Sequence, residues 1–149
     1  AMKQASLSTP FGDLTLTEED GAITALGWGQ AARQDRSDLL DAALRQLKEY
    51  ATGERQSFDL PLRVMGSDFQ RAVCTAIPFG HTRTYGEIAR DLGVPAQAVG
   101  GACGGNPIPV IIPCHRVMGA KGLTGFSGAG GVETKVALLR HEGAAGLLI

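Results

Sequence analysis

Ile111-Ile112-Pro113-Cys114-His115-Arg116-Val117 is the stretch around which the rest of the chain is organised. An apolar, β-branched run brings a cysteine and a histidine to the same point and becomes apolar again at Val117. A thiolate is a strong nucleophile, and a nearby base lowers the pKa of a thiol enough to supply it at neutral pH. The stretch therefore predicts a nucleophile site. Because adjacent side chains of an extended segment point to opposite faces, we expect a bridging water or a sharp turn between Cys114 and His115.

The composition is that of a globular chain. Its 149 residues are 44% hydrophobic, enough for one good core or two small ones. No apolar run approaches the roughly 20 residues of a membrane span, and the N-terminus does not resemble a signal peptide, so we expect a cytoplasmic protein without membrane contact. The three cysteines lack Cys-x-x-Cys spacing, which argues against a disulfide framework and a zinc knuckle.

The two halves of the chain differ in charge. Residues 1–60 carry six basic and ten acidic side chains, whereas residues 61–149 carry eight basic and five acidic ones, which gives net charges of −4 and +3. A mildly basic C-terminal half allows a polyanionic partner such as DNA or RNA but does not require one, because nucleic-acid binding usually leaves a more basic footprint.

Residues 1–62 are expected to form a small α/β scaffold domain. Apolar residues alternate up to Trp28 between turn signals at residues 10–13 and 19–21, a pattern typical of strands joined by hairpins. From Ser37 the spacing becomes helical, with Ser37 as the N-cap and Gly53 as the stop signal. A strand at residues 58–62 is expected to close the domain.

Residues 63–149 are expected to form a mostly helical domain, so that the whole chain belongs to the α+β class. Ser67-Asp68-Phe69-Gln70 and Thr84-Tyr85-Gly86-Glu87 both fit the capping box that opens a helix. The second helix stops at Gly93, and Pro95 is well placed to open another over residues 96–103. Two helices joined by a short turn containing glycine are typical of a helix-turn-helix unit. A last helix is expected from Val132 to Glu142.

The expected helix at residues 96–103 is nearly bare of side chains. It contains Gly100 and Gly101, and each glycine inside a helix costs about 1 kcal/mol relative to alanine. Small residues allow a backbone to approach a partner closely, and that partner is either another helix in the core or a groove of nucleic acid. The glycine-rich residues 119–131 are expected to form a lid or a binding rim.

Six segments, in their order and spacing, resemble the O6-alkylguanine-DNA alkyltransferases. The resemblance is dense from about residue 67 to residue 143, whereas the N-terminal part is similar only in its strand-rich pattern. The segments are Thr84-Tyr85-Gly86-Glu87-Ile88-Ala89, Val99-Gly100-Gly101-Ala102, Asn106-Pro107, Ile112-Pro113-Cys114-His115-Arg116-Val117, Gly125-Phe126-Ser127-Gly128 and Leu138-Leu139-Arg140-His141-Glu142-Gly143.

The resemblance implies direct repair, in which an alkylated guanine is extruded from the duplex and its alkyl group passes irreversibly to a cysteine. Cys114 would be the acceptor. His115 would take its proton through a water, with Glu142 holding the imidazole. Asn106 would steady the segment around the cysteine, and Tyr85 would donate a hydrogen bond or a proton to the leaving guanine.

The resemblance also implies how substrate and DNA are bound. The carbonyls of Cys114 and Val117 would accept from the exocyclic amine of guanine, and the amide of Ser127 would face O6, with Phe126 beside it. Double-stranded DNA would be bound through its minor groove by a monomer, without cofactor or metal, since residues 1–72 lack the cysteines and histidines that hold zinc in some relatives. The DNA-binding residues would be Thr84, Ala96, Ala98, Gly100, Gly101 and Arg116, and Gln97 in the recognition helix would belong to the substrate-binding residues.

One departure concerns the recognition helix, where Gln97 stands at the position at which the family usually places an arginine. Glutamine can replace the extruded base but brings no positive charge to the phosphates. Two other functions stay open at this point. One is a protein that binds the alkylated base without transferring the alkyl group. Known proteins of that kind have a different residue in place of the acceptor cysteine. The other is a cysteine hydrolase, which the adjacency of Cys114 and His115 disfavours.

Overall fold

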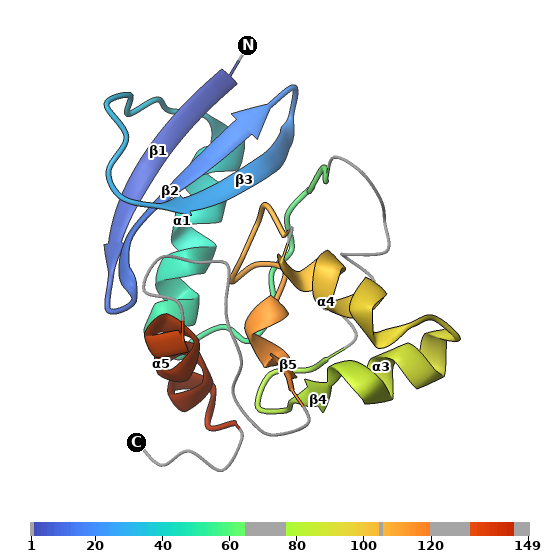
Figure 1. Cartoon of the computed structure of the whole chain (residues 1–149). Coiled ribbons are helices and arrows are strands. Elements are labelled where there is room, and N and C mark those ends of the chain that lie inside the picture. The colour runs from blue at the N-terminus through green and yellow to red at the C-terminus, as the bar shows by residue number, and fades with distance from the viewer. Residues whose placement is uncertain (1, 65–76, 105, 120–131, 145–149) are drawn as a thin grey trace. The chain divides into compact units, whose positions relative to one another are not determined.

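The computed structural model describes residues 2–64, 77–104, 106–119 and 132–144 (Figure 1). The chain divides into two compact units, Ala1–Met65 and Gly66–Ile149. The first contains a sheet and a helix and the second is mostly helical, so the α+β class expected from the sequence is confirmed. None of the helices in the described ranges is long and apolar enough to cross a membrane.

The first unit begins with an antiparallel meander of β1 (Met2–Thr9), β2 (Gly12–Glu19) and β3 (Ala22–Trp28). The turn from β2 to β3 is made by Asp20 and Gly21, with φ angles of 50° and 80°. Positive φ at both central residues is the mark of the type I′ turn that the Asp-Gly signal predicts. In β2, Leu14 and Leu16 point to the core, as the alternation of the sequence requires.

Helix α1 (Asp38–Ala51) packs against β1 and β2. The Ser37 hydroxyl accepts a hydrogen bond from the amide of Leu40 at 3.0 Å, so the predicted N-cap is confirmed. Leu40, Ala43 and Leu47 are buried on one stripe of this helix. The sheet and this helix therefore enclose one apolar core.

The strand predicted at residues 58–62 is wrong, because only an isolated bridge joins Leu62 to Ile23. Pro61 has no amide hydrogen and cannot donate to a ladder. The amide and carbonyl of Asp59 are bound by the side chain of Gln46, at 2.9 and 3.1 Å. The backbone of Asp59 is therefore satisfied by a helix side chain, while the carbonyl of Pro61 accepts from the amide of Ile23 at 2.8 Å.

The second unit contains a two-stranded parallel sheet of β4 (Arg83–Thr84) and β5 (Val117–Met118). Its helices are α3 (Tyr85–Leu92), α4 (Ala96–Gly104) and α5 (Val132–Glu142), and a short 3₁₀ helix, η1 (Cys114–Arg116), precedes β5. Strand β4 leads into α3, and β5 follows η1, the short helix that begins at Cys114. The pairing therefore brings the start of α3 beside the segment of the cysteine.

The helix-turn-helix outline is confirmed by α3 and α4, which pack against each other (Figure 1). The Thr84 hydroxyl accepts from the amide of Glu87 at 3.1 Å, and the Glu87 carboxylate accepts from the amide of Thr84 at 2.9 Å. This is the predicted capping box. Gly93 ends α3 with a φ of +68°, which glycine adopts without strain. The other predicted capping box, at residues 67–70, lies outside the described residues.

Candidate functional site

The chain reaches Cys114 through a tight loop, so the expectation of an extended segment is wrong. The amide of Ile112 donates to the carbonyl of Ile108 at 2.9 Å, and residues 114–116 form the 3₁₀ helix η1. Pro109 and Pro113 fix their own φ angles and lack amide donors, which breaks up a strand. Val110 has a φ of +72°, a conformation that costs on the order of 1–3 kcal/mol for a β-branched residue. The sharp turn considered from the sequence is present.

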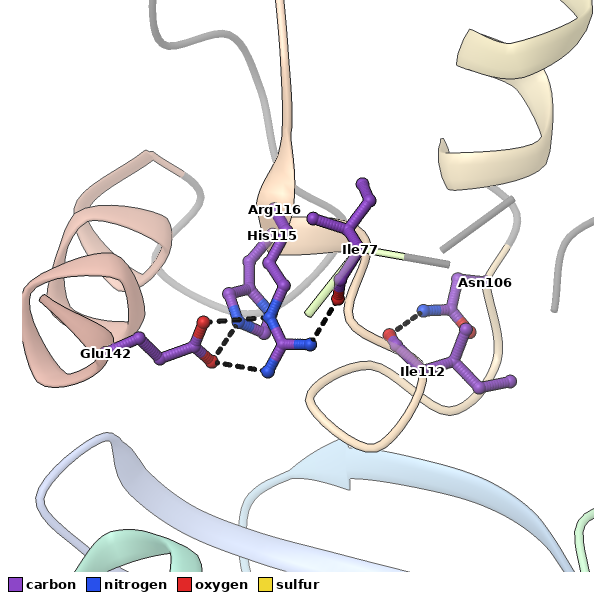
Figure 2. Close-up of polar contacts among 6 residues, drawn as sticks. All are labelled: Ile77, Asn106, Ile112, His115, Arg116 and Glu142. Carbon is purple, nitrogen blue, oxygen red and sulfur yellow. Dashed lines mark hydrogen bonds and ion pairs between the residues drawn. The ribbon is translucent and has the colours of Figure 1, made fainter. Parts of the chain in front are cut away.

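Asn106 closes this loop from inside. Its side-chain amide donates to the carbonyl of Ile112 at 2.8 Å (Figure 2). Its carbonyl oxygen accepts from the amide of Ile108 at 3.0 Å. The Asn106 side chain is buried, so both hydrogen bonds are shielded from water. Asn106 therefore fixes the path of the chain just before Cys114.

Cys114 and His115 are both buried, at 4% and 0% exposure. The Cys114 thiol is not part of a disulfide. Nε2 of His115 lies 2.6 Å from a carboxylate oxygen of Glu142, at the end of α5 (Figure 2). The structure therefore joins two of the residues singled out in the sequence, His115 and Glu142, in a direct hydrogen bond.

The protonation of His115 follows from its surroundings. Burial lowers the pKa of His115 below its ordinary value, against the opposing effect of Glu142, so the imidazole is neutral. A carboxylate can only accept, so Nε2 carries the proton and Nδ1 carries the lone pair. Nδ1 is buried and has no hydrogen-bond partner within the described part of the chain. The basic nitrogen of His115 is therefore the one that Glu142 leaves open.

Glu142 is kept ionised by two neighbours. Burial alone raises the pKa of a carboxyl group, but the hydrogen bonds from His115 and Arg116, together with the charge of Arg116, offset this effect and lower the pKa of Glu142 to about 2. Nε and Nη2 of Arg116 donate to the two carboxylate oxygens at 2.8 and 3.1 Å (Figure 2). Such a two-point pair is among the stronger ion pairs in proteins.

The expectation that Arg116 contacts DNA is corrected by this geometry. Its side chain is buried, and besides Glu142 it binds the carbonyl of Ile77 through Nη1 at 2.7 Å. The guanidinium also lies 5.9 Å from the ring centroid of Phe79. Arg116 is therefore an internal support of Glu142, and its charge is directed away from a surface partner.

Lys135 is a residue of this site that reading the sequence missed. It lies on α5, is 1% exposed, and donates from Nζ to the carbonyl of Val117 at 2.6 Å. Lys135 precedes Glu142 by about two helical turns, which places both on one face of the helix. That spacing was the available signal, but lysines on helices are usually exposed.

The helix-turn-helix carries the remaining predicted positions. Thr84 and Tyr85 are half-buried at the start of α3. On α4, Val99 is buried, whereas the exposed positions, none of which is charged, are Ala96, Gln97, Ala98 and Gly101. A Cβ atom added at Gly100 or Gly101 would meet no atom within 4 Å. Packing against another helix is therefore not the reason for these glycines in the described structure.

Some predicted positions cannot be placed. Phe126 and Ser127, and residues 120–131 of the expected rim, lie outside the described residues. Among the residues that the structure describes, no group of three or more histidine, cysteine or acidic side chains could hold a metal ion.

Comparison with known proteins gives matches over nearly the whole chain. The family model for the "6-O-methylguanine DNA methyltransferase, ribonuclease-like domain" matches residues 2–64, and the model for the DNA binding domain of the same methyltransferase matches residues 68–144.

Similar curated proteins and a solved structure cover both units. A methylated-DNA–protein-cysteine methyltransferase of Mycolicibacterium paratuberculosis is 42% identical, over 92% of this chain and 90% of the relative. The protein of the same name from Methanosarcina barkeri is 51% identical over 91% and 94%. The crystal structure of the Mycobacterium tuberculosis protein OGT in complex with DNA has a TM-score of 0.80 and 40% identity, and covers 95% of this chain and 92% of that one.

Proposed function

The chain belongs to the 6-O-methylguanine DNA methyltransferase family, and we infer that it repairs DNA by direct reversal, in a single transfer of an alkyl group from O6-alkylguanine to one of its own cysteines. Its partner is double-stranded DNA that carries the alkylated base. We propose Cys114 as the acceptor. The observation that carries this assignment is the buried Cys114 next in the chain to a neutral histidine whose basic Nδ1 is left open by Glu142.

The proposed reaction needs one proton acceptor and one electrophile. Nδ1 of His115 takes the proton of the Cys114 thiol through a water, while Glu142 stabilises the imidazolium that forms. The thiolate attacks the alkyl carbon, the S–C bond forms, and the bond from that carbon to O6 breaks. The electron pair of the broken bond stays with the guanine, which takes up a proton.

Recognition of the extruded base is proposed for η1 and β5, for the first residue of α3, and for Phe126 and Ser127. The carbonyls of Cys114 and Val117 accept from the exocyclic amine, and the Tyr85 hydroxyl supplies a hydrogen bond or a proton to the leaving guanine. The amide of Ser127 faces O6, with Phe126 beside it. The pairing of β4 with β5 supports the first part of this scheme, because it places the start of α3 next to the segment of Cys114.

DNA contact is proposed for α4, which would lie in the minor groove. The open space at Gly100 and Gly101 supports a close approach from outside, and the degenerate code of the minor groove suits a helix without charged readers. Thr84, Ala96 and Ala98 border the same contact, and Gln97 fills the place of the extruded base. The protein would act as a monomer in the cytoplasm, where its thiols stay reduced.

Intact-mass measurement tests the assignment. After incubation with excess duplex containing O6-methylguanine, the protein is expected to gain the mass of one methylene group and no more, because the thioether does not turn over. The Cys114→Ala variant should gain nothing while still binding the duplex. An unshifted wild-type mass, or a shift that persists in the variant, would contradict the proposal.

A further inference from the structure

Lys135 is the only lysine that is buried in the described part of the chain. Removing an ammonium group from water costs several kcal/mol, and an apolar side chain of similar length would fill the same space without that cost. The lysine therefore has to provide something that a methionine could not. Its Nζ donates to the carbonyl oxygen of Val117 at 2.6 Å, and this hydrogen bond connects the lysine to the segment of Cys114.

Both the backbone amide and the backbone carbonyl of Val117 make hydrogen bonds. It is the first residue of β5, where it pairs with Arg83 of β4. Its amide donates to the carbonyl of Cys114 and so closes the turn of η1. With Lys135 bound to its carbonyl, Val117 joins α5 to the turn that carries the acceptor cysteine and to the strand that leads into Tyr85.

We propose that Lys135 is a positioning residue for alkyl transfer, because its ammonium fixes the Val117 carbonyl so that the second lone pair of that oxygen receives the exocyclic amine of the extruded guanine. This inference rests on the proposed function. A carbonyl oxygen has two lone pairs, and Lys135 occupies one of them. Because the carbonyl is held in place before the base arrives, no conformational entropy has to be lost to order it during the reaction.

The charge of Lys135 has a second effect, on His115. Burial is the main reason for the lowered pKa of His115, and the positive charges of Arg116 and Lys135 act in the same direction. The groups that act on the imidazole are Glu142 and Lys135 from α5 and Arg116 from η1. Loss of the lysine charge should therefore raise the pKa of His115, whereas arginine at the same position should keep it low.

The test compares two duplexes that differ in one group. One carries O6-methylguanine and the other carries O6-methylhypoxanthine, which lacks the exocyclic amine. Single-turnover rates are measured for wild type, Lys135→Met, Lys135→Arg and the control Lys48→Met, whose lysine is exposed on α1. Duplex binding and thermal unfolding are measured on the same samples, which separates the rate of transfer from affinity and stability.

We expect Lys135→Met to slow transfer from O6-methylguanine by about 10- to 100-fold, the usual effect of losing a group that orients a primary contact. The loss on O6-methylhypoxanthine should be smaller by more than about fivefold, because that base has no amine for the carbonyl to receive. The rate of Lys135→Met should also rise at a higher pH than that of wild type. Lys135→Arg should recover part of the rate, and Lys48→Met should match wild type.

Equal losses on the two duplexes, or no loss at all, would overturn the inference and leave the proposed function intact. If Lys135→Met does not fold, Lys135→Arg decides by the same ratio, because arginine keeps a charged donor but displaces it from the carbonyl. Wild-type protein that accepts no methyl group from either duplex would remove the proposed function, and this inference with it.

Discussion

The two units treat charge in opposite ways. Among the described residues of the first unit, the buried polar side chains are Thr17 and Gln46, and no charged side chain is buried. The second unit buries four ionisable side chains that belong to or bind residues 115–117, which follow Cys114. They are His115, Arg116, Lys135 and Glu142. The described outer face of α4, by contrast, has no charged residue, although α1 in the first unit is lined with acidic and basic ones.

This difference indicates that the buried charges of the second unit serve the function of the protein and not its stability. A buried ion pair is often no more stabilising than apolar residues of the same volume, so a cluster of buried charges is weak evidence for stability. The first unit has an apolar core without buried charges, and its ion pairs, such as Arg55–Glu49, are partly exposed. The second unit carries charges that its core does not need, and all of them contact the segment of Cys114 or a residue that does.

The largest effect is expected at His115. We expect His115→Gln to reduce the rate of methyl transfer by about 10²- to 10⁴-fold, because the proposed proton acceptor is lost. Gln46→Leu, which removes a buried polar side chain from the first unit, should leave that rate unchanged although it loses two hydrogen bonds to Asp59. Single-turnover kinetics on an O6-methylguanine duplex decides. Similar rates for His115→Gln and wild type would mean that the buried cluster is not catalytic.

Two matched ion pairs show the contrast in stability. Glu142→Ala leaves Arg116 buried without its carboxylate, and we expect a loss of about 3–5 kcal/mol. Glu49→Ala in the first unit breaks the pair with Arg55, whose N–O distance is also 2.8 Å but whose side chains are 29% and 27% exposed. That change should cost at most about 1 kcal/mol.

The loss of stability in each variant is measured with a signal from the unit that carries the substitution. Trp28 is the only tryptophan and lies in β3, so its fluorescence follows the first unit during urea denaturation. Hydrogen exchange in peptides from α5 follows the second. Equal costs for Glu142→Ala and Glu49→Ala would show that burial does not distinguish the two pairs.

The second unit should also lose stability in mild acid. The pKa of His115 in the native state lies below its ordinary value of 6.5. As the pH falls below 6.5, the unfolded chain therefore binds a proton at His115 while the native state does not, and the native state becomes less stable. Stability should then fall by up to about 1.4 kcal/mol per pH unit. Glu142, with a pKa near 2 against an ordinary 4.5, adds a further loss between these two values.

Hydrogen exchange in α5 at pH 7.5 and pH 5.5 measures the histidine part of this loss. His115→Gln should remove it, whereas the exposed His81→Gln should not. A loss that is the same in wild type and in both variants would show that His115 is not its source.

The sequence was informative where local signals determine the structure. The N-cap at Ser37, the Asp20-Gly21 hairpin and the capping box at Thr84 each depend on neighbours within a few residues, and the structure contains all three. The strand at residues 58–62 failed because a side chain from a distant helix, Gln46, binds its backbone. Spacing along the chain contains no information about such a contact.

The site was partly predictable for the same reason. The residue types around Cys114 predicted a nucleophile, and the resemblance added Glu142 to His115. The buried position of Arg116 was missed, because the resemblance was taken to imply that this arginine contacts DNA. Its pairing with Glu142 depends on the docking of α5 on η1, which local sequence does not predict.

Smaller effects are expected at the uncharged face of α4. Gly100→Ala and Gly101→Ala should each stabilise the helix by about 0.5–1 kcal/mol, because a new Cβ meets open space and alanine favours helix. The same methyl groups should weaken duplex binding if α4 enters the groove. Hydrogen exchange in α4 and fluorescence anisotropy of a labelled duplex measure the two effects. Gly27→Ala, in β3, controls for a new methyl group elsewhere. Binding that is unchanged, despite slower exchange, would place the duplex on another surface.

The smallest effect is expected when α4 is given the charge that it lacks. Gln97→Arg adds a cation to an exposed position of the second unit and should tighten duplex binding by less than about tenfold. A new phosphate contact releases a counterion, so the plot of log affinity against log salt should steepen by about 0.9. Gln30→Arg adds the same charge to an exposed position of the first unit, which has no proposed DNA contact, and should leave that slope unchanged. A slope that steepens equally in both variants would reflect net charge alone, and the neutral face of α4 would then have no specific part in DNA binding.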